Sequence, residues 1–167
     1  MSSSDKNIFI WEGEYYIKEV VIPYGFTSIG SYAFSGCYSL TSITIPNSVT
    51  EIDNNAFSKL FSLTDITIPN SVTKIGNYAF SNSSFLFILI PNSVTEIGRG
   101  AFSKCSSLKK ISIPDGVTKI SEYTFSECSG VLQMYAVCTH FLAVIPTIQK
   151  FLNELKIQPK KKYFQPV

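Results

Sequence analysis

The sequence has little of what enzymes and metal proteins use. It contains a single histidine, His140, among 167 residues, which excludes histidine clusters for a metal ion or for paired acid–base chemistry. The P-loop, GxGxxG, GxSxG and HExxH motifs are all missing, and with them the common signatures of phosphate, dinucleotide, hydrolase and zinc-protease sites. We therefore expect a protein that is not an enzyme, with no catalytic residue, no metal ligand and no cofactor.

An excess of charge of one sign is also missing. Fourteen Lys and Arg residues stand against twelve Asp and Glu, a balance that does not predict a nucleic-acid partner. The one basic cluster, at 160–162, is expected to be a solvated tail. The most apolar segment, 131–145, is interrupted by Gln133, Thr139 and His140, so no membrane span is predicted.

The first sixteen residues lack the basic start and long apolar stretch of a secretory signal. On this ground alone a cytoplasmic location is the expectation. The single glycosylation sequon, Asn82-Ser83-Ser84, is then better explained as a polar loop than as a glycan site.

Repetition is what the sequence has in abundance. LTSITIPNSVTEI, from Leu40 to Ile52, is followed by LTDITIPNSVTKI, from Leu63 to Ile75, and the two are identical at eleven of thirteen positions. A proline and a phenylalanine each recur every 22 or 23 residues, the phenylalanines being Phe34, Phe57, Phe80, Phe102 and Phe125. Such a period indicates stacked structural repeats. The repeats, called rungs one to six below, begin at Ile17, Leu40, Leu63, Phe85, Leu108 and, for a partial sixth, Val131.

Each rung predicts the same local structure. The I-x-I alternation favours a short strand, and the proline after it ends the strand. A later position, held by Gly76 and Gly98 among others, suggests a tight bend with positive φ. The AFSxC segment predicts one helical or 3₁₀ turn that buries its phenylalanine. One rung cannot bury its own apolar side, so the rungs are expected to stack in parallel with the phenylalanines as an internal column.

The cysteines do not predict a metal site or a disulfide. Cys37, Cys105 and Cys128 occupy one rung position that Leu60 also fills, as a small buried hydrophobic residue would. Side chains stacked in register rarely adopt disulfide geometry, so we expect no bridge.

Solenoid ends need caps, and both termini offer candidates. Residues 1–16 contain two β-prone runs around Glu12-Gly13 and predict a β-hairpin cap. The rungs then occupy 17–136. In the remaining residues, 137–167, apolar side chains recur with helical spacing, which predicts a C-terminal capping helix before the basic tail. The apolar positions are Ile148, Phe151, Leu152 and Leu155.

The core IxIPxSVTxIGxxAFxxCxSL resembles the BspA-type leucine-rich repeats. The resemblance covers about 120 of the 167 residues and implies an α/β solenoid. In this fold a right-handed horseshoe carries a parallel β-sheet on its concave face and short helical or 3₁₀ turns on its convex side. Five full rungs and a partial sixth are expected. The resemblance also implies a protein-binding or adhesion role and a cell-surface or secreted location, as in surface antigens. No catalytic residue follows from it.

The variable strand positions locate the candidate site. On the concave face the second, third and fifth residues of each rung are expected to point outward. Rung four is apolar there, whereas its neighbours are small, polar or cationic, and an apolar patch on a hydrophilic sheet is typical of a partner contact. The predicted protein-binding residues are Thr44, Asp65, Thr67, Leu86, Phe87, Leu89, Lys109, Lys110, Ser112 and Tyr135.

Other interpretations of rung four remain open. Leu86, Phe87 and Leu89 could mediate self-association, internal cover could hide them, or the rung could have drifted. The leading functional hypothesis is a non-catalytic module that binds a protein ligand, and the alternative is a structural or self-assembling spacer. After the conserved threonine of each rung, the residues Ser28, Glu51, Lys74, Glu96 and Lys119 predict a ladder of alternating charge.

Overall fold

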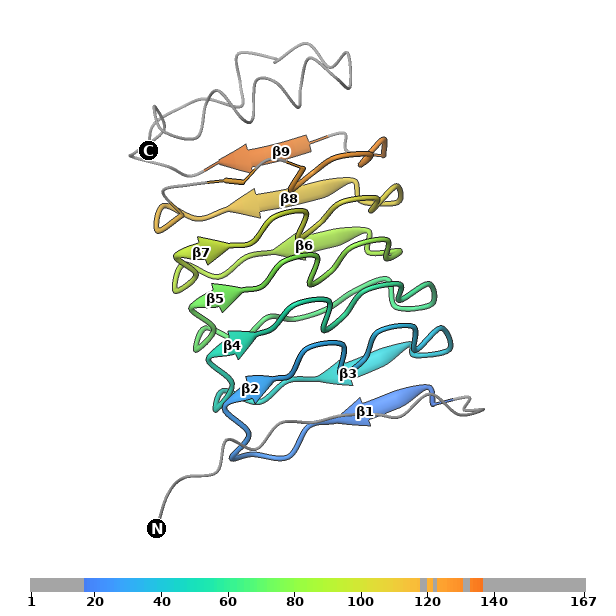
Figure 1. Cartoon of the computed structure of the whole chain (residues 1–167), viewed down its shortest axis with the longest axis vertical. Coiled ribbons are helices and arrows are strands. Elements are labelled where there is room, and N and C mark those ends of the chain that lie inside the picture. The colour runs from blue at the N-terminus through green and yellow to red at the C-terminus, as the bar shows by residue number, and fades with distance from the viewer. Residues whose placement is uncertain (1–16, 118–119, 122, 131–132, 137–167) are drawn as a thin grey trace.

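The computed structural model describes residues 17–117, 120–121, 123–130 and 133–136. In these residues the chain winds into a parallel β-solenoid whose strands stack along its long axis (Figure 1). The predicted repeat region is thus described nearly throughout. The predicted caps, 1–16 and 137–167, lie outside the described residues.

The I-x-I segments form the first column of strands. These are β1 (Glu19–Val21), β3 (Ser42–Thr44), β6 (Phe87–Leu89), β8 (Lys110–Ile113) and β9 (Gln133–Ala136). β1 pairs with β3 and β8 pairs with both β6 and β9, always in parallel. Rung three joins the column through a bridge from Asp65 to Phe87. The predicted parallel stacking is confirmed, and each register matches equivalent positions of two rungs.

The segments after the conserved threonine form a second parallel sheet. Its strands are β2 (Ser28–Ile29), β4 (Glu51–Ile52), β5 (Lys74–Ile75) and β7 (Glu96–Ile97), in that spatial order. The register pairs Glu51 with Lys74 and Lys74 with Glu96. These three residues therefore alternate in charge from rung to rung, as predicted. No direct ion pair joins these three side chains in the part of the chain that the structure describes. Their attraction therefore acts through solvent and is expected to be small.

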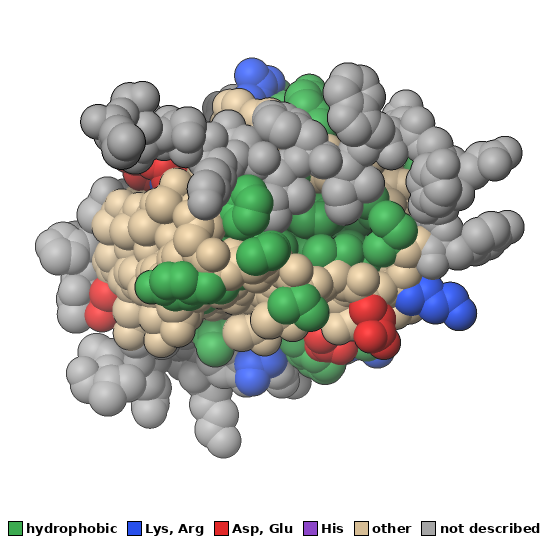
Figure 2. Space-filling view, turned by 90° about the horizontal axis from the view of Figure 1, so that it is seen from below, with side chains coloured by type: hydrophobic (Ala, Val, Ile, Leu, Met, Phe, Trp, Pro, Cys, Tyr) green, Lys and Arg blue, Asp and Glu red, His purple; other side chains and the backbone are tan. Residues whose placement is uncertain are grey.

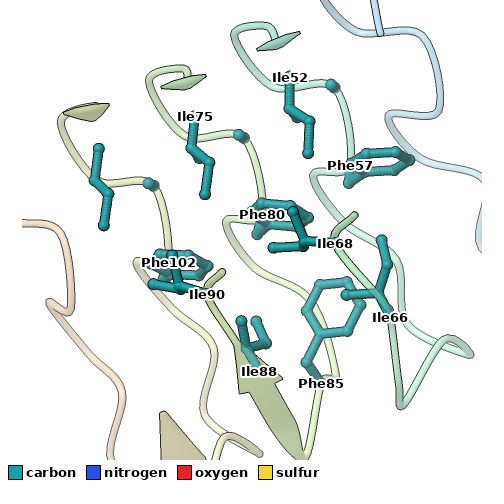
Figure 3. Close-up of a cluster of buried hydrophobic side chains, with 14 of the residues drawn as sticks. Ile52, Phe57, Ile66, Ile68, Ile75, Phe80, Phe85, Ile88, Ile90 and Phe102 are labelled. Atoms are coloured by element: carbon teal, nitrogen blue, oxygen red, sulfur yellow. The ribbon is translucent and has the colours of Figure 1, made fainter. Parts of the chain in front are cut away.

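The phenylalanine column forms the centre of the core (Figure 3). Ring centroids of Phe34 and Phe57 are 5.3 Å apart, those of Phe57 and Phe80 are 5.5 Å apart, and those of Phe80 and Phe102 are 5.4 Å apart, all with stacked rings. Phe85 meets Phe80 edge-on at 5.8 Å and is fully buried where other rungs have Leu or Ile. Rung three is one residue short beside it, and the larger ring fills the space there.

The AFSxC side of each rung consists of turns, and no helix occurs in the described residues. Positive φ occurs two residues before the phenylalanine, as at Tyr78 (55°), and two residues after it, as at Lys59 (59°). A residue in this left-handed conformation ends a helical turn, so the helical or 3₁₀ prediction is not confirmed here.

Positive φ was predicted at the rung position of Gly76 and Gly98, but neither glycine has it. They are small because the backbone of the preceding rung lies close: a Cβ atom on Gly98 would come 2.5 Å from the backbone nitrogen of Asn77.

Polar residues that recur in more than one rung bond one rung to the next. Thr50 Oγ1 donates to the carbonyl oxygen of Thr27 at 3.1 Å, and Thr73 Oγ1 donates to that of Thr50 at 3.3 Å. Asn54 Oδ1 accepts the N–H of Asn77 at 2.7 Å. These side chains satisfy backbone groups at the sheet margins, which explains their recurrence without a functional role.

Candidate binding face

Strand β6 presents two large apolar side chains to solvent. Phe87 is 51% exposed and Leu89 is 70% exposed, whereas Ile88 between them is 2% exposed. The alternation follows from the two-residue period of a strand, since Ile88 points into the core beside Phe85 (Figure 3). The "strand face" below means the outer side of the first column of strands, with Phe87 and Leu89 at its apolar centre.

Opposite charges flank this apolar centre. Phe87 lies in register between Asp65 of rung three and Lys110 of rung five. Both charged residues are exposed, and the carboxylate of Asp65 accepts a hydrogen bond from Thr64 Oγ1 at 3.1 Å. The face is thus acidic on the N-terminal side of Phe87 and basic on its C-terminal side.

The remaining predicted residues surround this centre. Thr44, Thr67 and Lys109 are exposed, and Ser112, which pairs with Leu89, is half-buried. Tyr135 lies in β9 beside Ser112, but its side chain is outside the described part of the structure. Strand pairing therefore brings the predicted residues of rungs four and five together, with those of rung three beside them.

Leu86, the third apolar residue of the predicted site, is half-buried, whereas Phe87 and Leu89 are exposed. Its N–H donates to Thr64 and its carbonyl oxygen accepts from Lys109, before the regular alternation of β6 begins. The apolar centre therefore consists mainly of two side chains.

Cys105 and Cys128 are internal structural groups, whereas Cys37 is half-buried. Cys105 Sγ donates to the carbonyl oxygen of Phe80 at 3.1 Å, and Cys128 Sγ donates to that of Phe102 at 2.9 Å. Burial raises the pKa of Cys105 to about 11 and that of Cys128 to about 12. Both thiols are consequently protonated at neutral pH and are not activated nucleophiles.

Ser83 occupies the corresponding place in the shortened rung. Its hydroxyl donates to the carbonyl oxygen of Phe57 at 3.0 Å. Ser83, Cys105 and Cys128 therefore all donate a hydrogen bond to a backbone carbonyl from this position. The sequence indicated only a buried position, because Leu60, which has no donor, also occupies it.

An exposed aromatic pair escaped the sequence analysis. Tyr38 and Phe61 stack with ring centroids 5.2 Å apart and are 55% and 50% exposed. Both follow the cysteine position, where rung three has lost a residue and rungs four and five have serine. The sequence signal for this contact is that two successive rungs carry an aromatic residue at the same position.

The end of the stack also carries apolar side chains. Viewed from the N-terminal end, hydrophobic groups lie towards the middle and several charged groups lie near the rim (Figure 2). Ile17, Val20 and Phe26 of rung one are only partly buried, which distinguishes this rung from the fully packed central ones.

Among the described side chains, no group of three His, Cys, Asp or Glu residues could hold a metal ion. No helix in the described ranges is long and apolar enough to cross a bilayer.

The family follows from the comparison with known proteins. The family model described as BspA type leucine rich repeat region (6 copies) matches residues 5–132. The chain belongs to this family. The resemblance inferred from the repeated core is therefore confirmed. No curated protein sequence matches the chain.

Solved leucine-rich repeat proteins share the fold. The T. pallidum leucine-rich repeat protein is 29% identical with a TM-score of 0.69, and the match covers 86% of this chain and 71% of that protein. A Bacteroides ovatus protein is 33% identical with a TM-score of 0.58, over 71% of this chain and 37% of the other. A Eubacterium ventriosum protein is 32% identical with a TM-score of 0.64, over 74% and 33%. This BspA-type chain thus spans about a third of the length of the latter two proteins.

Proposed function

We propose that this BspA-type chain is a non-catalytic protein-binding module that recognises its partner through the strand face. The observation that supports it most directly is the exposure of Phe87 and Leu89 on a regular sheet whose outward residues in rungs two, three and five are polar. Burying an exposed aromatic and an exposed leucine against a partner contributes roughly 25 cal/mol for each Å² removed from water. Large anchors at the centre of a contact typically dominate its binding energy.

The charges around the anchors supply specificity. An acidic residue on one side of Phe87 and a basic residue on the other favour a partner with the reverse order of charge. The threonines of rungs two and three offer hydroxyl groups and little bulk, so a partner can approach the sheet there. The family resemblance favours a cell-surface or secreted setting for such an adhesion or recognition role.

The test is a comparison of captured proteins. Intact protein, a Phe87→Ser/Leu89→Ser variant and a Val21→Ser control would be immobilised and exposed to the same extracts. Val21 is a matched control because it is 74% exposed and occupies the rung position of Leu89, but in rung one. We expect the double variant to lose specific partners that the control retains, with unchanged circular dichroism for all three.

The opposite result would favour the alternative. If the double variant stays folded and retains every partner, the strand face is not the recognition surface. A structural spacer role for the repeats would then be preferred.

A further inference from the structure

The strand face has a charge order that is complementary to itself. Along one row the residues are Asp65, Phe87 and Lys110, each one rung from the next, and all three are exposed. A row ordered acid, aromatic, base becomes base, aromatic, acid when it is rotated by 180° about an axis through its middle. A surface with this property can pair with an identical copy through a two-fold axis.

We propose that the partner fitting this face is a second copy of the chain, packed face to face with its strands parallel to those of the first and its rungs in reverse order. The inference rests on the proposed protein-binding role of the strand face and names its occupant. A two-fold axis lying between the two faces, parallel to β6 and passing over rung four, would place Phe87 of each copy against Phe87 of the other and Leu89 against Leu89. Both anchors, 51% and 70% exposed in the single chain, would then be covered.

The same rotation brings the charges together. Lys110 lies one rung beyond the axis, so it would lie over rung three of the other copy, at the position of Asp65. Each dimer would contain this pair twice. A two-fold axis along the stack would instead place rung five over rung five, so that lysines of the two copies would face each other, which like-charge repulsion disfavours.

The size of the face sets the strength of the contact. Six rungs about 4.8 Å apart and strands of about five residues give a footprint of roughly 400 Å² per copy. The pair would bury about 800 Å² in all, below the size of stable specific interfaces, so the dimer is expected to be weak and populated only at high protein concentration. Its exposed charge pairs should make it sensitive to salt.

Charge reversal tests the geometry directly. Asp65→Lys and Lys110→Asp would each place like charges opposite one another, so each variant alone should sediment as a monomer of 18.6 kDa at about 200 μM. An equimolar mixture of the two should dimerise again, as should the Asp65→Lys/Lys110→Asp double variant. Wild-type protein should approach twice the monomer mass over the same concentration range.

Several outcomes would overturn the inference. Wild-type protein that stays monomeric to about 1 mM excludes the dimer. A wild-type dimer that both single variants preserve, or that the mixture fails to restore, excludes this geometry. If a reversed variant is unfolded, Asp65→Asn and Lys110→Gln replace it, and each should weaken the dimer about threefold or more.

The proposed function has a separate readout. A monomeric wild type whose Phe87→Ser/Leu89→Ser variant loses captured proteins would retain the protein-binding role and exclude the second copy as occupant. A dimeric wild type with no captured protein lost in the double variant would restrict the face to self-association.

Discussion

Phe57 has a phenylalanine ring stacked on each side, at 5.3 Å and 5.5 Å between centroids. It is fully buried, so its loss leaves a cavity that neighbours in two rungs must tolerate. We expect Phe57→Ala to lower the free energy of unfolding by about 3 to 5 kcal/mol in a urea titration.

Phe61 provides the matched control for this change. It is also stacked on one aromatic ring, but it is 50% exposed. Phe61→Ala should therefore cost about 1 kcal/mol or less, because little apolar area leaves the core. A melting temperature of the Phe57→Ala variant within a degree or two of wild type would disprove the role of the column.

The buried thiols predict a loss of stability at alkaline pH. Burial raises the pKa values of Cys105 and Cys128 above their usual 9.0, to about 11 and about 12. Their stabilising contribution is complete below the unfolded pKa and decreases as pH rises from about 9 towards these folded values. Unfolding should become easier by about 1.4 kcal/mol per thiol for each pH unit in that window.

Serine substitution isolates this effect from other alkaline titrations. Cys105→Ser/Cys128→Ser keeps a small donor at each position, as Ser83 does naturally in rung three. Denaturation midpoints measured at pH 8, 9 and 10 should fall less steeply for this variant than for wild type. Equal slopes would show that the thiols do not contribute.

At the scale of one rung, the turns between the two sheets contain most of the backbone strain. Lys59 has a φ of 59° and an exposed side chain, a conformation that costs a non-glycine residue about 1 to 2 kcal/mol. Glycine adopts it without that cost, but it also gives the unfolded chain more freedom. Gly36 occupies the same place in rung one, with a φ of 75°.

Lys59→Gly is accordingly expected to stabilise the protein by up to about 1 kcal/mol. Lys59→Ala keeps the strain and should change the stability by less than about 0.5 kcal/mol. Urea midpoints of the three proteins measure both effects. A glycine variant less stable than the alanine variant would contradict the assignment of strain to this position.

The sequence predicted the structure of a single rung only in part. Alternation identified the strands, and repetition identified their register, because equivalent residues such as Ile52 and Ile75 must pair when rungs stack. The positive φ was missed because Tyr78 and Lys59 belong to residue types that rarely adopt it, and the tertiary contacts of the turn override that preference. Leu86 precedes the regular alternation of β6, so its half-burial could not be inferred from that pattern.

At the scale of the whole molecule, contacts pass from each rung to its neighbours. Side-chain hydrogen bonds such as those from Thr50 to Thr27 and from Thr73 to Thr50 join residues 23 apart, one rung period. Stability in such a molecule is approximately a sum over rungs and their interfaces. A complete rung can therefore be removed without changing how the remaining rungs pair.

Removal of rung two, residues 40–62, joins Ser39 to Leu63 and restores the natural Ser-Leu junction of Ser62 and Leu63. We expect this protein to fold with a lower melting temperature and to retain partner binding, because rungs three to five and their strand face remain. Removal of rung four, residues 85–107, should also leave a folded chain but abolish binding, since Phe87 and Leu89 leave with it. Both deletions remove 23 residues, so circular dichroism and melting curves control for their general cost. Equal binding by the two shortened proteins would exclude rung four as the centre of recognition, whereas loss confined to the second would assign recognition to the rung whose sequence departs most from the repeat.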